Sequence, residues 1–177
     1  MSELDEAWAL ALAEAEQRAR MAGHTDIAAY LALRNSNDLL RQTGVTWLID
    51  TFMNLAGEAN RFGASIQISR DDKHRFKVGS STMVGSLFTM RNGLRTLFVE
   101  AGWPRVPSDG FVSGGGLARG NLRHLGFKSA DAELVLTKTR TGVPNWVVID
   151  PAGKRLELHE ALARKQILIL LNEKRTR

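Results

Sequence analysis

The densest apolar pattern in the chain lies within residues 83–101, where two runs rich in valine, leucine, phenylalanine and threonine flank Asn92 and Gly93. Asn-Gly tolerates the positive φ angles of a type I′ turn, so the pattern predicts a two-residue β-hairpin. Such a loop pairs Met90 with Arg95. One face of the hairpin is apolar and the other is mixed, which predicts full cover on one side of a sheet and partial cover on the other.

Helical spacing marks the residues before this hairpin. Apolar positions three and four apart predict a helix over 3–22, with Ser2 as its N-cap. A second helix is predicted from Thr25 and ends at 35–37, because Asn and Ser side chains compete for backbone hydrogen bonds. A third helix is predicted from 39 to 59, and its dense apolar pattern indicates that it is the best buried.

Short alternating segments separated by polar turns predict strands outside the hairpin at 64–70, 75–78, 132–140, 146–149 and 154–158. Between 102 and 131 the chain is rich in glycine and lacks periodicity, which predicts a long loop with a short helix at 117–125. The segment from His159 to Leu171 favours a helix, although its apolar run at 167–171 also fits an edge strand.

These elements predict a single α+β domain over residues 1–177. N-terminal helices (1–62) pack on one face of a curved antiparallel sheet (63–158) of about five or six strands, and a C-terminal helix (159–173) follows. The long loop 102–131 belongs to the sheet region. A curved sheet closed by helices can leave an apolar pocket between the two layers.

Composition narrows the chemistry. The chain has no cysteine, which excludes thiol catalysis, disulfides and cysteine-based metal sites. Its four histidines do not fall at metal-ligand spacing, and no serine lies in a nucleophile-elbow motif. We therefore expect no metal or cofactor and assign no catalytic residue. Without a secretory signal or a membrane-spanning apolar run, the expected location is the cytoplasm.

Charge is distributed unevenly along the sequence. The net charge is +5. Residues 1–60 hold four basic and nine acidic side chains, a balance of −5, whereas residues 61–177 hold twenty basic and ten acidic ones, a balance of +10. This asymmetry fits an anionic partner for the C-terminal part, but it fits mutual attraction between the two parts equally well.

Two groups of basic residues are candidate anion sites. The first is the glycine-rich turn and the predicted helix after it, where backbone N–H groups and basic side chains would meet. It comprises Gly114, Gly115, Gly116, Arg119, Arg123 and His124. The second is a basic patch on neighbouring strands, made of Arg70, Arg75, Lys77, Arg91 and Arg95. The alternatives are a solvated surface loop and strand-edge charges that maintain solubility.

Three functions remain open from the sequence. The first is a non-enzymatic binding module for an anionic partner, either nucleic acid or a phosphate-bearing ligand. The second is a small-molecule-binding protein or enzyme that uses the pocket between helices and sheet. The third is a structural or assembly subunit, with a homo-oligomer as its simplest form. Few aromatic side chains fall at exposed sheet positions, although sheet proteins that bind single strands use them for stacking.

Overall fold

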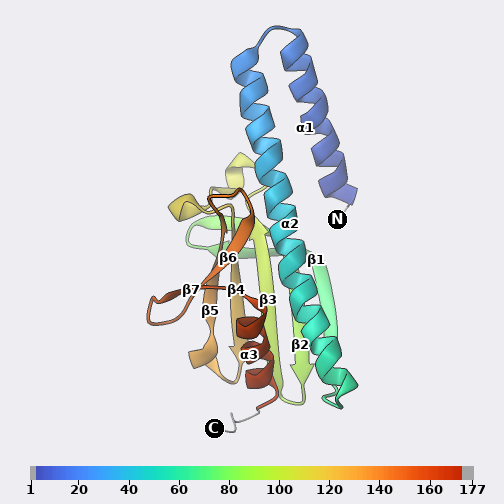
Figure 1. The fold of residues 1–177 in the computed structure, drawn as a ribbon, viewed down its shortest axis with the longest axis vertical. Coiled ribbons are helices and arrows are strands. Elements are labelled where there is room, and N and C mark those ends of the chain that lie inside the picture. Colours follow the sequence, from blue (N-terminus) through green and yellow to red (C-terminus); the bar gives the residue numbers. More distant parts are fainter. Residues whose placement is uncertain (1–2, 173–177) are drawn as a thin grey trace.

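The computed structural model describes residues 3–172, which form three α-helices and a seven-stranded antiparallel sheet (Figure 1). Each strand pairs with the next one along the chain, in the order β1 to β7. The elements are α1 (Glu3–Met21), α2 (Thr25–Arg61), β1 (Gln67–Val78), β2 (Ser81–Asn92), β3 (Arg95–Trp103), β4 (Ala118–Leu125), β5 (Ala132–Lys138), β6 (Pro144–Ile149), β7 (Arg155–Glu157) and α3 (Glu160–Leu170). The predicted α+β class and antiparallel sheet are confirmed, but the sheet has seven strands rather than five or six.

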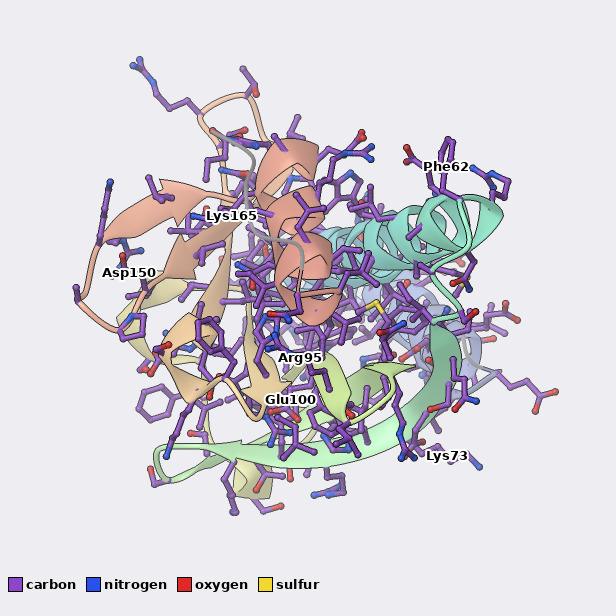
Figure 2. All side chains as sticks on the ribbon, turned by 90° about the horizontal axis from the view of Figure 1, so that it is seen from below. Phe62, Lys73, Arg95, Glu100, Asp150 and Lys165 are labelled. Atoms are coloured by element: carbon purple, nitrogen blue, oxygen red, sulfur yellow. The ribbon has the colours of Figure 1, made fainter. Side chains whose placement is uncertain are left out.

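The core lies between one face of the sheet and two of the helices. Phe88 of β2 and Leu97 of β3 pack with Leu48 and Phe52 of α2 and with Ile167 of α3. Figure 2 shows the sheet curling around these two helices. Burying this apolar surface is the main stabilising term of the fold.

The central hairpin forms, but its predicted register is wrong, because each residue of β3 pairs two residues further along β2 than predicted. Asn92 pairs with Arg95 and Met90 with Leu97, so the loop is Gly93–Leu94. Gly93 has φ +60, and no positive φ occurs at Asn92 or Leu94. A single positive φ at the first loop position is the type II′ arrangement, which needs glycine there. Because this shift moves pairs by two residues, the predicted inner and outer faces of the strands are unchanged.

Two further predictions in the sheet are wrong. The predicted polar turn at 71–74 is a bulge inside β1, because Asp72 and Lys73 together lie opposite Ser86. The predicted helix at 117–125 is strand β4. Its inward positions are alanine, glycine, leucine and histidine, of which only the leucine is strongly apolar, so the alternation of a strand is hard to detect in the sequence.

The predicted break at 35–37 is also wrong, because α2 runs unbroken for 37 residues. At 1.5 Å per residue it is about 55 Å long. Only its C-terminal part lies over the sheet; the rest pairs with α1 in a helical hairpin that projects past the sheet (Figure 1). We call α1 with residues 25–43 of α2 the arm.

The C-terminal helix is confirmed as α3, and the strand alternative for its apolar run is excluded. His159 caps it, because its Nδ1 accepts a hydrogen bond from the N–H of Leu162 at 3.3 Å. Residue 173, the last of the predicted helix, lies outside the described residues, as does the predicted N-cap Ser2.

Candidate functional site

The residues of the predicted glycine-rich anion site do not lie together in the structure. Gly114 and Gly115 lie in a short 3₁₀ turn before β4. Arg119 and Arg123 point to the outer face of the sheet, while His124 points to the core side. Arg119 pairs with Glu133 at 3.1 Å, so its charge already has a partner. The third glycine of the predicted site, Gly116, packs near Val135.

His124 is a buried core residue. Its Nε2 donates to Oε1 of Gln166 on α3 at 2.7 Å, and its backbone N–H donates to Asp131 at 2.7 Å. Burial lowers the pKa of the His124 side chain, while the bond to Gln166 and the charge of Asp131 partly oppose this effect. A neutral imidazole inside the core does not attract an anion.

The basic patch is dispersed. Arg70, Arg75 and Lys77 share the helix-facing side of β1, where Arg70 pairs with Asp72 at 2.6 Å and Arg75 with Asp109 at 3.0 Å. Lys77 donates to Thr82 at 2.7 Å. The other two members lie at the far end of the hairpin: Arg91 donates to Gly93 O at 3.1 Å and Arg95 to Ile169 O at 3.0 Å. Figure 2 shows Arg95 beside the end of α3, where its charge complements the helix dipole.

A small polar cleft lies between the start of α1 and the sheet. Arg105 forms an ion pair with Asp5 and stacks 3.6 Å above the Trp103 ring. Burial raises the pKa of Asp72, but hydrogen bonds from Arg70 and Ser86 outweigh it and hold the pKa below its ordinary value. The cleft therefore contains equal numbers of paired positive and negative groups rather than a positive surface.

Sequence reasoning missed a buried carboxylate on the outer face of the sheet. Glu100 of β3 is 3% exposed. Its Oε2 accepts from His74 Nε2 at 2.6 Å and from Arg123 at 3.3 Å, and its Oε1 accepts from Asn121 at 2.9 Å. The signal in the sequence is one glutamate between apolar residues in a strand. Its contacts join β1, β3 and β4 and leave none of its oxygens unpaired, so we interpret the cluster as structural.

The space where the sequence predicts an apolar pocket holds large side chains. Trp146 and Phe52 are fully buried there. The indole N–H of Trp146 donates to the carbonyl oxygen of Gly44 at 2.8 Å, which ties β6 to α2.

The arm carries a row of four residues on α2, Tyr30, Leu33, Asn37 and Leu40, spaced three, four and three apart. This spacing places them on one face of the helix. Tyr30 is 62% exposed and Leu33 is 58% exposed. The next residue of the series is Gly44, which is buried against Leu136 of β5. Asn37 and Leu40 are half-buried, so the α2 row is exposed at Tyr30 and Leu33 and becomes covered toward Gly44.

Charged residues on this part of α2 contact α1 or the loop before β4, where Nε of Arg41 donates to the carbonyl oxygen of Leu117 at 2.7 Å. Between Ile27 and Ile49 they number three, Arg34, Asp38 and Arg41. Asp38 is buried, accepts from Trp8 Nε1 of α1 at 3.1 Å and pairs with Arg41 at 2.7 Å. The Arg34 guanidinium lies 5.0 Å from the Trp8 ring centre. The four residues of the α2 row are uncharged, and the exposed Asp26, four residues before Tyr30, continues their face at the tip of the arm.

Comparison of the chain with models of protein families, with curated proteins and with solved structures found no match. Among residues 3–172, no three histidine, aspartate or glutamate side chains are grouped so that they could bind a metal ion. None of the helices in this same part of the chain is both long and apolar enough to span a membrane.

Proposed function

We propose that the protein is a structural or assembly subunit that docks another protein chain on the α2 row. The observation that carries this proposal is the pair of exposed apolar side chains Tyr30 and Leu33, on a helix face that becomes covered by the chain's own sheet at Gly44. The arm that carries them projects away from the sheet (Figure 1).

The composition of the face supports docking. Protein interfaces are depleted of charge and enriched in aromatic residues at their centres. The α2 row has Tyr30 and Leu33 at its exposed end, and Trp47 extends the same heptad spacing beyond Gly44. The three nearby charges already have partners on α1, on α2 itself or in the loop before β4, so the contact does not have to desolvate unpaired ions.

Binding of an anionic partner stays a second hypothesis, but its candidate basic residues do not lie together in one site. Its cations on the sheet are spread over both faces and both ends, and four of them already pair with aspartate or glutamate. A salt-dependent anisotropy change of a labelled oligonucleotide, lost when Arg75 and Lys77 are replaced by glutamine, would revive it.

The absence of cysteine gives a direct test of the docking proposal. A single thiol is introduced on the α2 row by Leu33→Cys, and the matched control Leu10→Cys places it on the outer side of α1. The two leucines are 58% and 64% exposed, so the thiols of the isolated subunit should react with maleimide at similar rates.

In a lysate of the cells that naturally produce the chain, docking should slow labelling of the Leu33→Cys variant by about tenfold or more while the control stays fast. Equal labelling rates of the two variants in the lysate would refute docking on this face.

A further inference from the structure

We infer that the occupant of the α2 row is a second copy of this chain, bound antiparallel about a two-fold axis near residue 35. This inference rests on the proposed docking function. It identifies the partner and fixes the orientation and register of the contact.

The spacing of the row is self-complementary. Intervals of three, four and three residues read the same in both directions about residue 35. In an antiparallel pair, Tyr30 therefore lies opposite Leu40 of the second copy, and Leu33 lies opposite Asn37. A two-fold contact requires one patch to match itself, and this row meets that requirement.

The two ends of the arm on α2 place the two-fold axis at the same residue. The arm portion of α2 begins at Thr25, and the sheet covers the helix from Gly44 onward. With the axis at residue 35, Thr25 of each copy lies opposite Val45 of the other. Each arm then lies along the part of α2 that the sheet of the other copy does not cover. The tip of the arm ends where that sheet begins.

Orientation follows from the position of the sheet. At Gly44, the sheet lies under the helix face that carries the α2 row, because Gly44 packs against Leu136 of β5. In a parallel pair joined through this face, the two sheets would occupy the same space. Each sheet lies at one end of its own arm (Figure 1), so the antiparallel arrangement separates the two sheets to opposite ends of the pair.

Charge also favours a second copy. A two-fold axis brings each charge of a patch near its own copy, so a charged patch repels itself. The α2 row has no charge, and its one polar side chain, Asn37, both donates and accepts hydrogen bonds. The two asparagines lie near the axis, where each can satisfy polar groups of the other copy.

Sedimentation of the purified full chain tests the identity of the partner. We expect a dimer mass at micromolar concentration, and Leu33→Glu should raise the dissociation constant by about hundredfold or more, since it buries charge in the contact. The matched control Leu10→Glu should remain dimeric. Both leucines are exposed, so both variants should keep the near-UV circular dichroism of the wild type.

Disulfide trapping tests the register. Mixing the Leu33→Cys and Asn37→Cys variants under mild oxidation should give a cross-linked heterodimer. Each variant alone should not cross-link, because its two thiols are offset by four residues, about 6 Å along the helix axis. Cross-linking of Leu33→Cys with itself would show a parallel contact and overturn the antiparallel dimer.

The outcomes separate this inference from the docking proposal. A monomer in purified form, with the Leu33→Cys thiol still protected in lysate, would overturn the second copy and leave docking of another protein intact. A monomer whose thiol is unprotected in both conditions would overturn both. A dimer that Leu33→Glu and Leu10→Glu leave equally stable would place the contact elsewhere and overturn the inference.

Discussion

Single residues on the outer face of the sheet show how a buried charge is accommodated. Glu100 is held by His74, Asn121 and Arg123 from two other strands. A buried carboxylate is tolerated only when its oxygens accept hydrogen bonds. Removing it destabilises the fold, because its buried donors are then left without an acceptor. The cluster therefore locks strand pairing where a hydrophobic side chain would leave His74 and Asn121 without acceptors.

We expect Glu100→Gln to destabilise the fold by about 2–3 kcal/mol, because the amide replaces an acceptor oxygen with a donor facing His74 and Arg123. The matched control is Glu133→Gln, which also removes a carboxylate paired with an arginine of β4 but is 61% exposed. Its cost should stay below about 1 kcal/mol. Urea denaturation of both variants measures the difference, and equal costs would contradict the structural role of the cluster.

Two glycines are expected to respond in opposite ways to alanine. A Cβ on Gly85 of β2 would lie 2.0 Å from the carbonyl oxygen of Ala101, so Gly85→Ala should cost about 3 kcal/mol or more. A Cβ on Gly57 of α2 meets nothing within 4 Å, so Gly57→Ala should stabilise by about 0.5–1 kcal/mol. Thermal unfolding measures both changes, and destabilisation by Gly57→Ala would count against the continuous helix α2.

His124 should make stability depend on pH. Burial holds its folded-state pKa below the ordinary value of 6.5, whereas the unfolded chain titrates near 6.5. The unfolded state thus binds more protons below 6.5, and stability that is fully present above this pH is lost as pH falls through it. The groups facing the ring are Gln166, Asp131 and Arg95.

The measurement is urea denaturation between pH 6.5 and 5, a window above the ordinary pKa values of the carboxyl groups. The wild type should lose more free energy of unfolding across this window than His124→Gln, whose amide still bonds Gln166. Parallel losses in the two proteins would show that another group governs this range.

At the scale of elements, periodicity predicted most of the fold. The helical stripes and the alternating strands gave α1, most of α2, α3 and six strand positions, because burial on one face leaves a periodic trace in the sequence. Local side-chain preferences gave a wrong prediction where contacts between helices decide the structure. Asn35 and Ser36 suggested a break, but Asp38 and its contacts with α1 hold the helix together there.

β4 and the hairpin turn show two other limits. The inward residues Ala118 and Gly120 of β4 carry little hydrophobic signal, so their alternation is masked. The turn was predicted one residue too early, because strand pairing across several residues decides which two residues form the loop. Glu100 and its partners lie far apart in the sequence, so only the assembled sheet reveals their cluster.

The α2 row was not predicted from the sequence, whose apolar spacing indicated only that the helix over 39–59 is buried. An amphipathic pattern shows that a helix face is covered without showing whether the cover belongs to the same chain. The sheet ends at Gly44, and this end point, set by the folded structure, separates core from candidate interface.

At the scale of the whole molecule, the charge asymmetry of the sequence is only partly resolved within one copy. Two ion pairs within residues 3–172 join acidic groups of the first sixty residues to basic groups of the rest, Asp5 with Arg105 and Glu58 with Arg164. The hydrogen bond from Arg164 is the main cause that lowers the pKa of Glu58. The first pair ties α1 to the segment after β3, and the second joins α2 to α3.

Assembly through the arm should couple stability to concentration. A partner that binds only the folded state raises the free energy of unfolding with its own concentration, so the thermal midpoint of a dimer rises as the chain becomes more concentrated. Calorimetry from about 5 to 500 μM should show this rise for the wild type and for Leu10→Glu. Leu33→Glu should show a constant midpoint, because its charge prevents the contact while its exposed position leaves the monomer intact. A wild-type midpoint independent of concentration would mean that the exposed face of the arm adds nothing to the stability of the purified protein.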